Sequence, residues 1–240
     1  MELPPYIALG VLTLVLAVAN YLLPSRRKRI NRALASKPRA LVRDAHGSVR
    51  LIGRIRRSGD LLRAPLSGRP CIAYEVLVDE PGLVSKRGGA EWRRMVELRE
   101  AQSFFVADES GEARIDTSGP FLMSVDYDRS GKTEGKYPGK HQDLASFLTS
   151  IDVVSTDWLG EWISFRYAEG VLEDGELVTV SADSVLEVDS GGERAGPRSP
   201  PQRLVLRGTE ALPLLISDAR EARGSTRDVR GSDPDPDNHD

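Results

Sequence analysis

The sequence predicts a mainly β protein: an antiparallel, barrel-like domain with one short helix, preceded by a single N-terminal transmembrane helix. Three observations predict this class. Residues 3–24 carry no charged side chain, the middle of the chain consists of short apolar runs with period two, and Gly, Pro and Asp clusters separate those runs. A chain of 240 residues is long enough for one medium domain with appendages.

Residues 1–24 form the predicted transmembrane anchor. The segment 7–23 is almost entirely aliphatic, and about 20 such residues in a helix cross the roughly 30 Å hydrocarbon core. The alternative is a cleavable signal peptide, because Ala17-Val18-Ala19 resembles a cleavage site. Two features oppose it: only Glu2 is charged before the apolar run, and the basic residues follow that run.

Residues 25–46 form a basic segment, in which residues 30–44 favour a short helix that ends at Pro38. Positive charge beside a span stays cytoplasmic, so the sequence predicts an outside N-terminus and a cytoplasmic domain from Ser25 onward. Five cations next to the anchor are predicted to contact anionic lipid at the membrane surface: Arg26, Arg27, Lys28, Arg29 and Arg32. The plainer alternative is that they only set the topology.

Residues 47–217 form the predicted β domain, and its first half contains three strand signals and one hairpin signal. Apolar and polar residues alternate over 49–54, and 71–78 is a β-branched and aromatic run. Residues 92–107 indicate one long strand with a possible bulge. A hairpin is predicted around residues 108–111, with Asp108 bonding the backbone of the turn.

The second half of the domain contains the predicted helix, residues 141–149, with Leu144, Phe147 and Leu148 on one face. Strands are predicted at residues 121–127, 162–168, 177–188, 204–206 and 214–216, with loops at 128–140 and 190–202 and a turn at 173–175. Residues 218–240 are polar and rich in Gly and Asp, which predicts a disordered acidic tail.

Composition excludes several classes of function. One cysteine and three scattered histidines permit no intramolecular disulfide and no Cys/His zinc site, and a net charge of −3 argues against a nucleic-acid binder. No catalytic motif, metal site or cofactor-binding loop is predicted. Cys71 has two interpretations: a nucleophile with His46 or His141 as its base, or a small buried apolar side chain, which its strand context favours.

The loop before Cys71 is the predicted partner-binding site, formed by Pro65, Leu66, Ser67 and Gly68. Loops carry binding residues more often than strands do. The competing interpretation is a strand-entry turn, in which Pro65 fixes φ and Gly68 supplies a conformation that other residues avoid.

Three stretches resemble one family in the same order along the chain. They are Gly53…Leu62-x-Ala64-Pro65-Leu66-Ser67-Gly68-x-x-Cys71-x-x-Tyr74, then Phe104-Phe105-Val106-Ala107-Asp108-x-x-Gly111-x-Ala113, then Glu169…Leu172-x-x-Gly175-Glu176-x-Val178-x-Val180. The combination resembles the GIDE domain, also called the BAM (beside-a-membrane) domain, of a mitochondrial membrane-bound E3 ubiquitin ligase and its bacterial relatives. The resemblance covers roughly residues 47–217.

The resemblance implies a membrane-adjacent domain that recognises partners. The family's ligases also carry a second membrane span and a RING finger, which holds two zinc ions on eight Cys/His ligands. This chain has four Cys and His residues in total, so it does not perform ubiquitin transfer unaided. In the family's ligase the domain lies between two membranes, whereas the basic segment here predicts the cytoplasm.

The sequence therefore predicts a membrane-anchored, non-catalytic adaptor that binds a protein partner and touches lipid through its anchor and basic segment. The alternative is an enzyme or enzyme subunit, either under the family label of E3 ubiquitin transferase or with a cysteine-dependent activity at Cys71.

Overall fold

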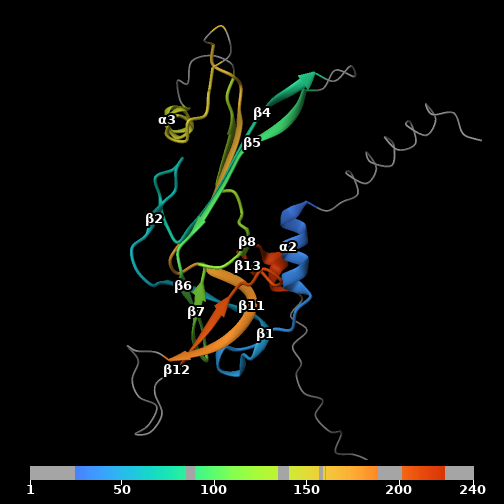
Figure 1. Ribbon diagram of the computed structural model, residues 1–240, viewed down its shortest axis with the longest axis vertical. Coiled ribbons are helices and arrows are strands. Elements are labelled where there is room, and N and C mark those ends of the chain that lie inside the picture. The colour runs from blue at the N-terminus through green and yellow to red at the C-terminus, as the bar shows by residue number, and fades with distance from the viewer. Residues whose placement is uncertain are drawn as a thin grey trace, which may run out of the picture.

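The computed structural model describes residues 25–84, 90–134, 141–156, 159, 161–188 and 202–224. In this part of the chain the protein is mainly β, with two α-helices. A closed barrel lies at one end of an elongated molecule and a second sheet at the other (Figure 1). Helix α2 (Arg26–Ala35) lies along the side where the two parts meet.

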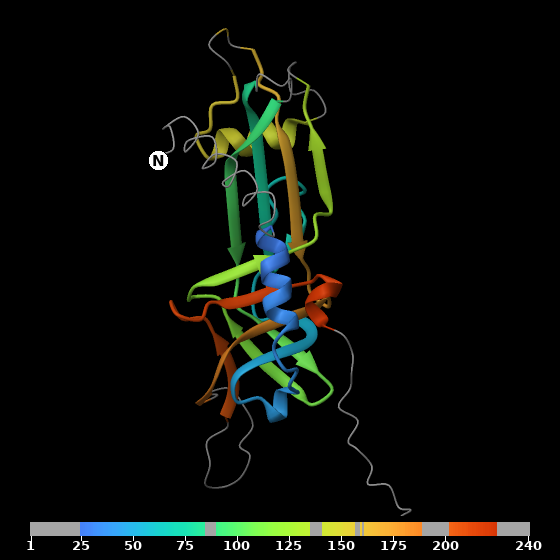
Figure 2. The ribbon, with the colours of Figure 1, turned by 90° about the vertical axis from the view of Figure 1, so that its right-hand side faces the viewer.

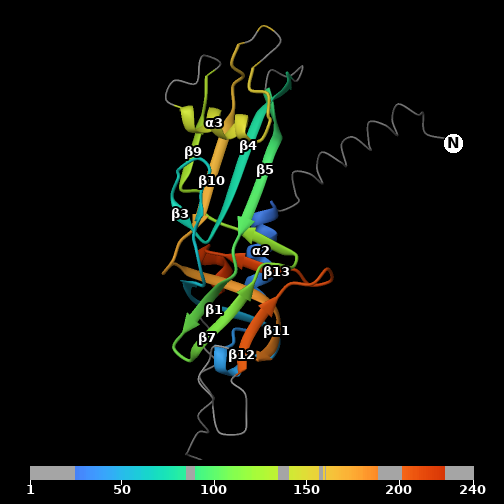
Figure 3. The same ribbon diagram turned by 60° about the vertical axis from the view of Figure 1, so that its left-hand side comes forward.

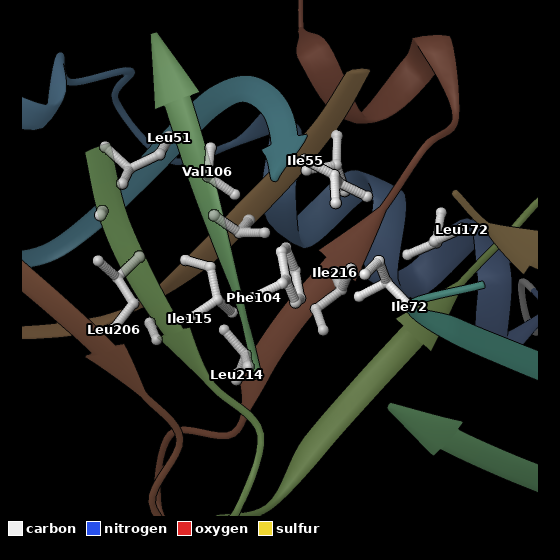
Figure 4. Packing of buried hydrophobic residues seen from close by; sticks show 14 of the residues in the cluster. Leu51, Ile55, Ile72, Phe104, Val106, Ile115, Leu172, Leu206, Leu214 and Ile216 are labelled. Carbon is white, nitrogen blue, oxygen red and sulfur yellow. The ribbon is translucent and has the colours of Figure 1, made fainter. Parts of the chain in front are cut away.

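Five strands close the barrel in the order β1, β6, β7, β12, β11 and back to β1. Their bounds are β1 (Gly47–Arg57), β6 (Phe104–Asp108), β7 (Gly111–Asp116), β11 (Leu177–Val188) and β12 (Gln202–Arg207). Leu51, Ile55 and Val106 are fully buried inside the barrel (Figure 4). Period two in these strands places alternate side chains in the core.

Strand β1 pairs with both β11 and β6 because it changes partner near its middle. Its first part pairs with β11, and from Arg54 onward it pairs with β6. A Cβ on Gly53 would clash with the carbonyl group of Ala107. Glycine at this position therefore permits the close approach of β6 that closes the barrel.

Two further strands extend the barrel sheet on one side: β13 (Leu214–Ser217) beside β11, and β8 (Phe121–Ser124) beside β13. Helix α2 and the 3₁₀ helix η3 (Arg220–Arg223) pack beside them (Figure 2). Ile30, Leu34 and Ala222 are buried together at this contact. The segment 218–224, assigned to the tail from its sequence, is thus packed against α2.

The second sheet has the strand order β5, β4, β10, β9. Its strands are β4 (Ala73–Val84), β5 (Ala90–Ala101), β9 (Arg129–Lys132) and β10 (Arg166–Leu172). Helix α3 (Gln142–Ser150) covers one face of this sheet through Leu144, Phe147 and Leu148, as predicted (Figure 3). The short hairpin of β2 (Leu62–Arg63) and β3 (Pro70–Cys71) adds to the same core, and η1 (Val42–Asp44) precedes β1.

The structure confirms the mainly β class and the barrel and corrects several details. Among the described residues there are two α-helices: α3, and α2, which begins earlier than the short helix predicted within residues 30–44. The strand pairs β12–β7 and β13–β8 are parallel, where an antiparallel domain was predicted. Residues 92–107, predicted as one strand, belong to β5 and β6 in different sheets. The predicted loop 128–140 contains β9.

No helix among the described residues has the length and hydropathy needed to cross a membrane. The predicted anchor, residues 1–24, lies outside the described part of the chain, as do the loop 190–201 and the tail from residue 225 onward.

Candidate functional site

The predicted partner loop, residues 65–68, is a turn whose polar groups are bonded inside the protein. The backbone N–H groups of Leu66 and Ser67 donate to Oε2 of Glu169, at 2.6 and 3.4 Å. Glu169 is 1% exposed and Leu66 is 2% exposed. Because this carboxylate already occupies the loop's N–H groups, a ligand would have to displace a buried charge to reach them.

Other backbone polar groups of the loop also form hydrogen bonds within the protein. Gly68 has φ +68°, where glycine is favoured, and its N–H donates to the carbonyl of Ala64 at 2.9 Å. Arg129 donates to the carbonyl of Leu66. Pro65 and Ser67 are half-buried and Gly68 is exposed, so the strand-entry turn describes this loop better, and only part of it is open to a partner.

Cys71 lies in the core under this loop with 0% exposure. Burial raises the pKa of its thiol to about 11, and the nearby Glu169 carboxylate adds to the rise. At neutral pH the thiol is therefore protonated and a poor nucleophile. Among the described contacts, His141 meets the Tyr167 hydroxyl at 3.3 Å and His46 the carbonyl of Asp44 at 2.8 Å, neither of them Cys71.

The basic residues predicted to touch the membrane fall into two sets. Arg26 pairs with Glu97 at 2.8 Å, and Arg27 pairs with Asp126 at 2.5 Å and lies 4.5 Å from the centre of the Tyr127 ring. These two side chains are half-buried and bind helix α2 to the domain. The exposed cations of the helix are Lys28, Arg29 and Arg32.

Arg50 fixes the other end of α2. This β1 side chain is 7% exposed, and its Nη1 donates to the carbonyl groups of Leu34 and Ala35, both at 3.2 Å. A cation at a helix C-terminus satisfies free carbonyls and the helix dipole. Burial lowers the pKa of Arg50. Helix α2 is therefore attached to the domain at both of its ends.

The strongest candidate site lies on the face of the second sheet opposite α3. We call it the open face; the strand register places on it Glu75, Leu77, Asp79, Trp92, Arg94, Glu97, Arg99, Ser130, Lys132, Arg166 and Ala168. Only the end next to the barrel meets α2, and Figure 2 looks onto this face. A sheet face this rich in charge is suited to a polar partner rather than to a core.

The end of the open face next to α2 contains a hollow of about 330 Å³. Glu75 lies at its base, 2% exposed, and accepts from the Tyr127 hydroxyl at 3.0 Å and from Arg99. Desolvation raises the pKa of Glu75 despite these bonds. The hollow is closed on one side by Arg26 and Arg27 at the start of α2.

The far end of the open face contains a second hollow of about 410 Å³, which we call the upper hollow. Asp79 pairs with Arg94 there. The guanidinium of Arg166 lies 4.0 Å from the centre of the Trp92 ring, and the ammonium of Lys132 lies 5.6 Å from it. Two cations thus lie within reach of a cation–π contact with one tryptophan ring.

This site was not predicted from the sequence. Its residues come from four strands, and one of them, β9, was predicted to be loop. A usable signal was present in β4 and β5, where Glu75, Asp79, Arg94 and Arg99 alternate with buried residues such as Val76 and Val78. That alternation assigns one face to a core and the other to solvent.

Within the described residues, no group of three or more His, Cys, Asp or Glu side chains is placed to hold a metal ion. Comparison with protein-family models, with curated proteins and with solved structures gives no match. The resemblance to the GIDE domain therefore remains a prediction that rests on the three motifs in the sequence.

Proposed function

We propose that this chain is a membrane-anchored, non-catalytic binding module that holds a protein partner beside the bilayer on its open face. The observation that carries the proposal is the open face itself, a charged sheet surface with two hollows, one of which borders the start of α2. Residue 25 directly follows the predicted anchor, so in the anchored protein this face lies close to the membrane.

The attachment of α2 supports the same proposal. A flexible linker would allow the domain to rotate relative to the anchor. Here the ion pairs of Arg26 and Arg27 and the hydrogen bonds of Arg50 hold the helix against the domain in one position. The orientation of the open face relative to the predicted anchor is then restricted. A restricted orientation reduces the entropy lost when a membrane partner binds.

The contact surface proposed here differs from the one predicted from sequence. Leu66 is buried and the loop N–H groups are bonded to Glu169, whereas Trp92, Lys132 and Arg166 are presented together on the open face. Trp and Arg are the residue types that most often dominate binding energy at interfaces. The enzyme alternative at Cys71 receives no support from the buried, protonated thiol.

An in-cell crosslinking pull-down of the tagged full-length protein tests the proposal. We expect a partner to be recovered with the wild type, with the loop variant Pro65→Ala + Ser67→Ala and with the barrel variant Arg114→Ala. The open-face variant Trp92→Ala + Arg166→Ala should lose it while keeping the thermal melting of the wild type. Recovery that depends on the loop and not on the open face would reject the proposed contact, and no recovery above an anchor-only control would reject the function.

A further inference from the structure

We infer that the segment bound in the upper hollow is an acidic, extended stretch of polypeptide, an inference that rests on the proposed function and specifies its partner. The residues lining this hollow include three cations, Arg94, Lys132 and Arg166, and one carboxylate, Asp79. Asp79 is already paired with Arg94. The lining of the hollow therefore has a net positive charge that an anionic ligand could neutralise.

Arg166 and Lys132 supply that charge. Neither forms an ion pair with a carboxylate among the described residues, and both side chains are exposed. The two residues are cross-strand neighbours, because Arg166 on β10 pairs with Lys132 on β9. Two like charges side by side are unfavourable alone, and a carboxylate placed between them would relieve this repulsion.

The Trp92 ring positions the two cations without neutralising them. It lies 4.0 Å from the Arg166 guanidinium and 5.6 Å from the Lys132 ammonium. A cation–π contact restricts the rotamers of long side chains while leaving their N–H donors free. The donors are thus arranged before the ligand arrives, which lowers the entropic cost of binding.

The shape of the hollow favours a polypeptide over a flat lipid surface. Its lining combines short residues, Ala168 and Gly131, with the long side chains of Arg94 and Arg166. A planar bilayer surface would touch only the tips of these side chains. A single extended chain is narrow enough to enter the hollow, where its carboxylates meet arginine in the bidentate geometry that this pair prefers.

A peptide titration on the full-length protein tests the inference. The protein is placed in phosphatidylcholine nanodiscs, and the probes are a fluorescein-labelled peptide of alternating Glu and Ser and a length-matched peptide of Gln and Ser. We expect fluorescence anisotropy to show binding of the Glu/Ser peptide alone. The charge reversal Lys132→Glu + Arg166→Glu should raise its Kd by at least about tenfold.

The matched control is Arg114→Glu, which reverses an exposed arginine on barrel strand β7. It should change the Kd by less than about twofold, because its charge is far from the hollow and screened by salt. An equal loss of affinity in this control, or no binding of the Glu/Ser peptide, would overturn the inference. So would binding of the Glu/Ser peptide by the Lys132→Glu + Arg166→Glu variant with the Kd of the wild type.

Failure here is distinguishable from failure of the proposed function. If the full-length protein still recovers a partner through Trp92 and Arg166 in cells while the Glu/Ser peptide does not bind, the module stands and its partner is not acidic. If neither is observed, both proposals fail.

Discussion

At the scale of single residues, carboxylates that accept backbone N–H groups shape the turns of this protein. Glu169 holds the loop at residues 66 and 67, Asp108 accepts from the N–H groups of Val42 and Ser110, and Asp174 accepts from Arg57. Hydrogen bonds to a charged acceptor are about twice as strong as neutral ones. Burial opposes ionisation of Asp108, but the bonds from Ser110 and Val42 outweigh it and lower its pKa.

We expect Glu169→Ala to destabilise the protein by about 3 kcal/mol, because it leaves two backbone donors without their buried acceptor. Glu169→Gln retains one acceptor oxygen and should cost less than half as much. Urea unfolding followed by tryptophan fluorescence measures both. Equal and small losses would show that the loop is not held by this carboxylate.

Cys71 provides a second test at this scale. Since burial raises its pKa to about 11, an aromatic disulfide reagent at pH 7.5 should label the folded protein slowly, at a rate set by opening of the structure. Labelling in denaturant should be fast. Rapid labelling of the native protein would instead revive the interpretation of Cys71 as a nucleophile.

Asp218 predicts a pH dependence of stability. Burial raises its pKa from 3.8 to about 6, and the charges of Asp126 and Glu176 add to the rise. The folded state therefore binds this proton more tightly than the unfolded state, so the stabilisation is present below about pH 4 and is lost as the pH rises through 6.

The variant Asp218→Asn keeps an oxygen that accepts from the N–H of Asp126 and removes the ionisation. Compared with the wild type, its urea midpoint should be higher at pH 7.5 and should differ little at pH 4. A midpoint difference that does not change with pH would show that Asp218 does not titrate as described.

At the scale of elements, α2 connects the predicted anchor to the domain, and Arg50 holds its C-terminal end. Replacing Arg50 with Met removes the side chain that bonds the carbonyls of Leu34 and Ala35. Hydrogen exchange over residues 26–36 should become faster by about tenfold or more while β11 keeps its protection, since only the helix loses a contact.

The control for Arg50 is Arg54→Met on the same strand. Arg54 is exposed and donates to the carbonyl of Gly175 at 2.9 Å, so its loss should leave exchange in α2 unchanged. If both variants released the helix, the effect would belong to β1 as a whole and not to the Arg50 bonds.

Elements with strong local signals were predictable from sequence. The helix 141–149, the hairpin held by Asp108 and the turn at Gly175, where φ is +84°, all occur in the structure. The division of residues 92–107 between two sheets was not predictable, because periodicity describes the faces of a strand and not its partners. The strand β9 is short and contains Gly131, so its pairing depends on β10 and not on its own propensity.

The candidate site could not be predicted from the sequence for the same reason. Single residues such as Trp92 and Arg166 carry no local signal, and they meet only because β5 and β10 both pair with β4. Conversely, the loop at residues 65–68 stands out in the sequence for a structural reason, namely the glycine turn and the buried Leu66. A conspicuous motif here marks a folding constraint more than a contact surface.

At the scale of the whole molecule, the barrel forms one end and the second sheet extends away from it (Figure 3). One face of that sheet is covered by α3, and the other is charged and borders the start of α2. The central claim is that this second face receives the partner beside the membrane.

The measurement that tests this claim most directly compares the two sides of the same sheet. A photo-crosslinking amino acid is placed in the full-length protein at Ser130, exposed on the open face, or at Ser146, exposed on α3. The account predicts a crosslinked membrane-fraction product from Ser130 that is absent from Ser146. A product from Ser146 alone, or the same product from both positions, would contradict it.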